Sequence, residues 1–142
     1  MKEIKVAAGL ETYNINGVCE IAFCPTDPVF AEKVYNVFEQ LDQKQEGYAE
    51  EIKRAEKREI FDIARRRDAE LRDTINGIFD FDICSAVFGS VSVCALSDGL
   101  PLWSNLLLGI MDEIDSGFER EQKRTNPRVE KYAAKYRAKN RK

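Results

Sequence analysis

Residues 48–76 form a long, highly charged segment that contains neither proline nor glycine. This segment constrains the fold of the 142-residue chain more than any other feature. No proline lies between residues 29 and 100, and 15 of the 23 residues in 51–73 are charged. Opposite charges recur four positions apart, as at Asp68 and Arg72, and such pairs stabilise solvent-exposed helices. We therefore expect a helix over residues 48–76, which would be roughly 44 Å long at about 1.5 Å per residue.

The apolar residues of this segment form two stripes that do not line up. The first comprises Tyr48, Ile52 and Ala55, and the second comprises Ile60, Ala64, Leu71, Ile75 and Ile78. Helical geometry at about 100° per residue rotates the second stripe by roughly 140° from the first. Either the helix breaks near Lys57, or its two halves pack on different surfaces. We expect the second arrangement, a largely continuous helix.

The residues before this segment predict a β-hairpin followed by a helix. Asn16-Gly17 separates two apolar runs, and the Asn-Gly pair favours a two-residue turn because both positions adopt positive φ. The hairpin is expected over about residues 10–23. A helix follows, with Thr26 or Asp27 as its N-cap. The apolar stripe of that helix consists of Phe30, Val34, Val37, Phe38 and Leu41.

Two further core helices are expected in the second half of the chain. Asp82 can cap a short helix that ends at Gly89, and residues 98–101 begin the last core helix. The apolar stripe of the last helix comprises Leu102, Leu106, Ile110, Ile114 and Phe118, with Trp103, Leu107 and Met111 beside it. Together these patterns predict a mainly α protein with a small N-terminal β-hairpin. In this α+β fold a helical bundle includes one long charged helix and carries a basic C-terminal tail.

The apolar stripe of the last helix covers about half of its circumference, which has two explanations. The helix lies either at the centre of the core or at an interface with another chain. For an interface the candidate residues are Leu102, Trp103, Leu106, Leu107 and Ile110, together with Tyr48 and Ile52. The open edges of a two-stranded hairpin would also favour a homo-oligomer.

Charge divides the chain into a core domain at residues 1–120 and a flexible tail at residues 121–142. The core contains 13 Lys and Arg against 23 Asp and Glu, whereas the tail contains 9 against 2. A basic amphipathic helix in the tail is expected to order on binding. Its apolar residues are Val129, Tyr132, Ala133 and Tyr136, and its basic contact residues are Arg128, Lys131, Lys135, Arg137 and Lys139. A nucleic acid, an acidic protein or the acidic body of a neighbouring copy would suit it, and a solvated terminus is the alternative.

The residue types that commonly carry catalysis are scarce. The chain contains no histidine, which removes Ser-His and Cys-His pairs and the neutral nitrogen ligand of zinc sites. No glycine-rich phosphate-binding motif is present. The cysteines are Cys19, Cys24, Cys84 and Cys94, and only the first two have the spacing of a zinc knuckle. We expect the four cysteines to be small buried hydrophobic residues, and a metal site built from all four thiolates is the alternative. We also expect no enzyme activity and no cofactor.

Hydropathy and the N-terminal residues favour a soluble cytoplasmic protein. The longest strongly apolar stretch, residues 99–111, is shorter than the roughly 20 residues needed to span a bilayer. Residues 1–6 lack the apolar core of a signal peptide. We therefore expect no membrane contact.

Three stretches of the chain carry a resemblance to a known group of proteins. They are Tyr13–Gly17 with Cys24–Pro28 and the helix after it, Phe81–Gly89, and Ser97–Asn105 with its apolar helix. Together with the basic tail, they resemble small proteins encoded in the tail-morphogenesis region of tailed phages and prophages of Gram-positive bacteria. Within that region they are most similar to the tail assembly chaperones.

The resemblance implies a non-enzymatic, mostly helical protein that multimerises, coats the tape measure protein and recruits tail tube subunits. It implies that the protein acts in the cytoplasm of the bacterial host and is absent from the finished virion. The alternatives are a structural component of the virion and a nucleic-acid-associated protein that uses the basic tail.

Overall fold

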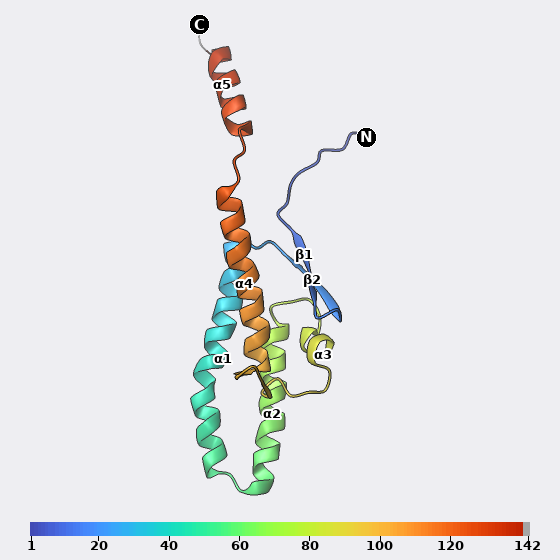
Figure 1. The fold of residues 1–142 in the computed structure, drawn as a ribbon, viewed down its shortest axis with the longest axis vertical. Helices are drawn as coiled ribbons and strands as arrows, with labels where there is room; N and C mark the ends of the chain where they lie inside the picture. Colours follow the sequence, from blue (N-terminus) through green and yellow to red (C-terminus); the bar gives the residue numbers. More distant parts are fainter. Residues whose placement is uncertain (141–142) are drawn as a thin grey trace.

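The computed structural model describes residues 1–140, and the side chains of residues 1–138. Its elements are β1 (Glu11–Ile15), β2 (Cys19–Phe23), α1 (Pro28–Arg54), α2 (Lys57–Asn76), α3 (Ile83–Phe88), β3 (Leu96–Ser97), β4 (Leu100–Pro101), α4 (Leu102–Lys123) and α5 (Arg128–Asn140). The protein is mainly helical with a small N-terminal antiparallel hairpin, which confirms the predicted α+β class. The β1–β2 hairpin and α3 lie on one side of the bundle formed by α1, α2 and α4 (Figure 1).

The charged segment contains a break, so the continuous helix predicted over residues 48–76 is wrong. α1 ends at Arg54 and α2 begins at Lys57. The two residues between them, Ala55 and Glu56, adopt extended conformations. The helices fold back on each other as an αα-hairpin (Figure 1). The alternative, a break near Lys57, is therefore confirmed, and the two out-of-phase apolar stripes lie on two separate helices.

The β1–β2 hairpin is confirmed and contains one more residue than a simple two-residue turn would need. Asn16 and Gly17 have positive φ, and the Val18 N–H donates to the Ile15 carbonyl at 3.0 Å. The strand pairing nevertheless places Ile15 opposite Cys19, so Val18 is a bulge. The residues that face the core are Tyr13, Ile15, Cys19, Ile21 and Phe23. Because side chains alternate between faces, the extra residue is what puts the odd-numbered positions of both strands on the same side.

The centre of the core lies between α4 and α1. Trp103 and Leu107 of α4 are fully buried, as are Val34 and Leu41 of α1. The Trp103 and Phe38 ring centroids are 5.6 Å apart. The other buried apolar residues are Ile21, Phe23, Leu71, Ile75, Ile83, Cys84, Val93, Leu106 and Ile110. The apolar stripe predicted for the helix after the hairpin is thus confirmed as core.

Two aspartates cap helices where the sequence predicts them. Asp27 accepts a hydrogen bond of 2.9 Å from the Val29 N–H at the start of α1. Asp82 accepts one of 3.0 Å from the Ser85 N–H at the start of α3, which ends at Gly89. Both contacts satisfy N–H groups that have no partner inside the first turn of a helix.

The last core helix begins after a turn that the sequence patterns did not predict. Asp98 and Gly99 have positive φ and connect the short strands β3 and β4. α4 then starts at Leu102, whose N–H donates to the Ala95 carbonyl at 2.8 Å, and the Trp103 N–H donates to a second loop carbonyl at 3.0 Å. The loop backbone therefore caps this helix in place of a side chain.

Both ends of the chain leave the bundle in the same direction. α4 runs to Lys123 and so crosses the predicted domain boundary at residue 120. α5 confirms the basic helix expected in the tail, and it lies beyond the end of α4, away from the other helices (Figure 1). Residues 1–10, which we name the N-terminal arm, are extended and leave the hairpin at this same end (Figure 1). The flexibility of the tail stays a prediction.

Candidate partner-binding surfaces

Four of the predicted interface residues of α4 are not available on the surface. Trp103, Leu106, Leu107 and Ile110 are buried among the chain's own helices. Their assignment to an interface is therefore wrong, and the alternative, a helix at the centre of the core, is confirmed. Leu102 is half-buried in the first turn of α4.

The two predicted interface residues of α1 contribute to the αα-hairpin. Tyr48 and Ile52 are half-buried near the end of α1. The Arg67 guanidinium of α2 lies 5.4 Å from the centroid of the Tyr48 ring, and burial raises the pKa of this tyrosine. One turn further, Arg66 of α2 donates two hydrogen bonds, of 3.0 and 3.2 Å, to the Glu51 carboxylate of α1. The chain therefore supplies its own partner for this part of α1.

The predicted contact residues of the tail lie on α5, which is amphipathic and uncovered. Its exposed basic residues are Arg128, Lys131, Lys135 and Arg137, and Lys139 lies in the same helix with its side chain outside the described residues. Its apolar side chains include Val129, Tyr132 and Tyr136, which are 78%, 43% and 56% exposed. A helix that shows an apolar stripe to solvent beside basic residues is built to lie against an apolar or acidic surface.

The N-terminal arm is a second uncovered apolar surface, which was not among the predicted contact residues. Every residue of the arm is exposed, including Ile4 at 87% and Val6 at 76%. With Ala8 and Leu10, these residues occupy every second position. Such alternation is typical of a β-strand with one apolar face, and it could have revealed the arm.

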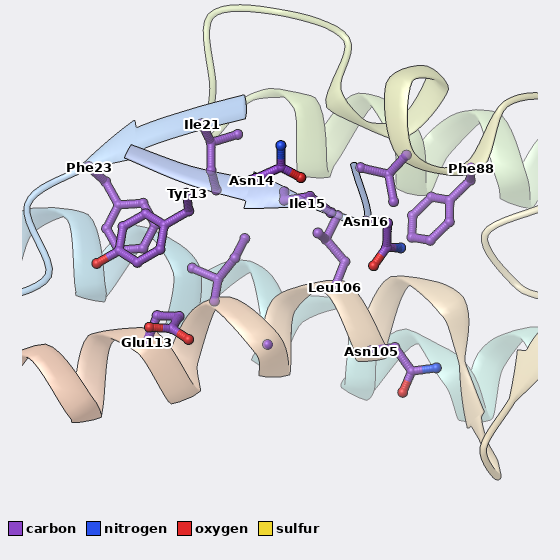
Figure 2. Close-up of a pocket in the computed structure, with 13 residues that line it drawn as sticks. Tyr13, Asn14, Ile15, Asn16, Ile21, Phe23, Phe88, Asn105, Leu106 and Glu113 are labelled. Carbon is purple, nitrogen blue, oxygen red and sulfur yellow. The ribbon is translucent and has the colours of Figure 1, made fainter. Parts of the chain in front are cut away.

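A partly open cavity of about 390 Å³ lies between the β1–β2 hairpin and α4 (Figure 2). Tyr13 and Phe23 stack at one end of it, with 4.4 Å between ring centroids, and Phe88 of α3 lies at the other end. Asn105 and Glu113 project from α4 at its edge. Apolar and aromatic side chains make up most of the lining, and Asn14, Asn16, Asn105 and Glu113 add polar side chains to it. The cavity can therefore hold a small group that is mainly apolar.

The ionisable groups beside this cavity form a structural clamp. The Tyr13 hydroxyl donates a hydrogen bond of 2.8 Å to Glu11. Burial and this hydrogen bond raise the pKa of Tyr13 to about 12, so the phenol stays protonated at neutral pH. The same hydrogen bond and the Arg120 guanidinium, which donates at 2.8 and 2.9 Å, lower the pKa of Glu11. The carboxylate thus joins the hairpin to the C-terminal half of α4.

The cysteines are separate thiols. Cys84 is fully buried, and burial raises its pKa to about 12, whereas the other three are half-buried. Within the described residues no group of three or more Cys, Asp or Glu side chains is placed to hold a metal ion. The four-thiolate site that the sequence left open is therefore not formed in this part of the chain.

Among the described helices, none is long and apolar enough to cross a membrane. Comparison of the chain with models of known protein families, with curated proteins and with solved structures gives no match.

Proposed function

We propose that this protein is a non-enzymatic assembly protein that works by binding other protein chains, and specifically a phage or prophage tail assembly chaperone. In this role it multimerises, coats the tape measure protein and recruits tail tube subunits in the cytoplasm of the bacterial host. The observation that carries the proposal is the uncovered apolar surface of the N-terminal arm and α5, which leave the bundle at the same end (Figure 1).

Two properties of these surfaces suit reversible binding. Each is a short, exposed segment at the edge of a well-packed core, so a partner can cover it without unfolding the bundle. Each is also apolar on one side only, with charged residues beside the apolar positions. A chaperone must cover the apolar faces of long helices and release them later, and modest amphipathic contacts allow both steps.

The direct test is co-expression with the tape measure and tail tube proteins of the same phage or prophage. A tagged tape measure protein should retain the wild-type chain through affinity purification. The double variant I4D/V6D removes the apolar face of the arm and should reduce recovery by about tenfold or more, because charged side chains cannot be buried cheaply in that contact.

The matched control is E3K/K5E, which exchanges two charges on the same arm and keeps both its net charge and its apolar residues. Its recovery should equal that of the wild type. If neither tail protein retains the wild-type chain, the chaperone proposal is wrong. Detection of the protein at high copy in purified particles would instead support the alternative of a structural virion component.

Nucleic-acid binding is a second candidate, because α5 combines exposed basic residues with two exposed tyrosines. Arg128, Lys131, Lys135 and Arg137 could contact phosphates, while Tyr132 and Tyr136 could stack on bases. Phosphate contacts predict a steep loss of affinity between low and moderate salt. Removal of residues 121–142 should then abolish binding to a labelled single-stranded oligonucleotide and leave the fold of the core intact.

A further inference from the structure

α5 carries three basic residues at regular helical spacing. Arg128, Lys131 and Lys135 occupy positions i, i+3 and i+7, which places them on one face of the helix. All three are exposed, and none forms an ion pair with another described residue. Tyr132 and Tyr136 lie beside them on the apolar stripe of the same helix. We name these three residues the basic triplet.

α1 carries an acidic stripe whose spacing matches the basic triplet. The stripe consists of Glu32, Glu39, Asp42 and Glu46, which are all exposed. The last three again occupy positions i, i+3 and i+7, and they form no ion pair within the described part of the chain. Tyr35, which is 58% exposed, lies on the same face. The stripe therefore offers negative charge and one aromatic ring to a partner.

No basic residue interrupts this stripe. The first 19 residues of α1, Pro28–Glu46, contain two lysines, Lys33 and Lys44. At about 100° per residue both lie roughly 100° or more around the helix from every acidic residue of the stripe. The stripe thus keeps its full negative charge, which a basic helix can neutralise.

We infer that α5 of one copy docks on the acidic stripe of α1 in a second copy, with the basic triplet facing Glu39, Asp42 and Glu46. This contact rests on the proposed function and specifies how the chaperone would multimerise. Within one copy α5 lies beyond the end of α1, so it is directed away from its own stripe (Figure 1). The acidic domain at residues 1–120 of one copy would repel the same domain of a second copy. The oppositely charged tail supplies the attraction that brings the two copies together.

This contact is heterologous, because the donor helix and the acceptor helix are different surfaces of the protein. Each copy that donates α5 still offers its own acidic stripe to the next copy. Such an interface closes into a ring or continues as an open filament, depending on the rotation between neighbours. A filament would present many copies along a line and a ring would present them around an axis, and either arrangement can surround an elongated helical protein.

A second acidic triplet in the chain provides a matched control. Asp112, Asp115 and Glu119 of α4 are exposed and also occupy positions i, i+3 and i+7. Lys123 follows Glu119 by four residues on the same face and offsets part of its charge. We therefore assign the docking surface to α1 rather than to α4.

The experiment measures self-association of the full chain by sedimentation velocity over a range of concentrations. Three variants are compared with the wild type: the tail reversal R128E/K131E/K135E, the stripe reversal E39K/D42K/E46K, and the two combined. The control is D112K/D115K/E119K, which changes the net charge as much as the stripe reversal does. Thermal unfolding followed by circular dichroism checks the fold of each variant. If the stripe reversal unfolds at a lower temperature than the wild type, E39Q/D42N/E46Q replaces it.

The wild type should form oligomers at low salt that dissociate at about 0.5 M salt, where exposed charges are screened within a few ångström. Each single reversal should weaken self-association by about tenfold or more, the combined variant should restore it, and the control should associate like the wild type. Four outcomes would each overturn the inference. The wild-type chain stays monomeric, the tail reversal has no effect on self-association, the combined variant does not restore self-association, or the control weakens it as much as the stripe reversal does. Because capture by the tape measure protein is measured separately, a monomer that still binds it would refute this contact and the multimerisation of the chain. Its binding to the tape measure protein, the other part of the proposed function, would still stand.

Discussion

The Asp68 carboxylate of α2 accepts a hydrogen bond of 2.8 Å from the backbone N–H of Val93, a residue 25 positions further along the chain. The same carboxylate accepts two bonds of 3.1 Å from Arg72, whose guanidinium also donates to the carbonyl oxygens of Gly89 and Val91 at 3.0 and 2.6 Å. One ion pair therefore holds the loop between α3 and α4 against α2.

Replacement of Asp68 by alanine should lower the free energy of unfolding by about 2 kcal/mol, because it leaves a half-buried guanidinium without its counter-ion and a backbone N–H without an acceptor. Chemical denaturation measures the change. Asp73→Ala, on an exposed position of the same helix, is the control and should change stability by less than about 0.5 kcal/mol. Equal losses in the two variants would show that the ion pair does not anchor the loop.

Two glycines of α4 should respond in opposite ways to alanine. A Cβ atom at Gly117 would lie 2.5 and 2.6 Å from Pro25 carbon atoms, whereas one at Gly109 would meet no atom within 4 Å. We expect Gly117→Ala to cost about 1–3 kcal/mol, because α4 must move away from the connection between β2 and α1. Gly109→Ala should raise the unfolding free energy by up to about 1 kcal/mol through helix propensity. Thermal unfolding of both variants checks the prediction, and a stable Gly117→Ala would contradict the close approach.

Acid should destabilise α3 through Asp82. Hydrogen bonds from the Ser85 hydroxyl and N–H, and then from Asn76, hold the pKa of Asp82 below its ordinary value of 3.8. The charged form is therefore favoured by folding, and its contribution is complete above about pH 3.8 and lost as the pH falls through the lowered pKa. In Asp82→Asn the unfolding free energy should depend less steeply on pH in this acidic range. Asp80→Asn, an exposed neighbour, should retain the wild-type slope.

The thiol of Cys84 should be inert in the folded protein. A pKa of about 12 against an ordinary value of 9.0 leaves roughly a thousandfold less thiolate at neutral pH, and the side chain is fully buried. Mass spectrometry after brief treatment with a thiol reagent should find Cys84 unmodified, and treatment in denaturant should label it. Rapid labelling of Cys84 in the native state would mean that α3 opens readily.

Much of the fold could be predicted because its signals act over a few residues. Asn16 and Gly17 specify a turn through their tolerance of positive φ, and Asp27 and Asp82 cap helices within two or three residues of themselves. The basic residues of α5 were found in the same way, from composition and helical spacing. The N-terminal arm was not predicted as a strand-like segment although its alternation is local, because no turn signal or partner strand lies next to it in the sequence.

The core position of Trp103 illustrates what spacing alone leaves open. An apolar stripe predicts that a helix buries one face, but the same stripe is expected for a subunit interface and for a core. The structure assigns this face to the chain's own core because α1 lies against it, with Phe38 in contact. Whether such a stripe lies in the core or at an interface depends on where another helix of the chain packs.

The sequence by itself determined the hairpin turn, the helix caps and the helical character of most of the chain, since each depends on neighbouring residues. It also determined the division between an acidic domain and a basic tail, since this depends on composition. Only the tertiary structure decided that the charged segment breaks at Ala55 and Glu56, because neither residue is a helix breaker. Folding back there allows residues such as Leu71 and Ile75 to be buried in the core that contains Val34 and Leu41. Burial of apolar surface between segments far apart in the chain outweighs the few local hydrogen bonds lost at the break, and no local pattern reports that balance.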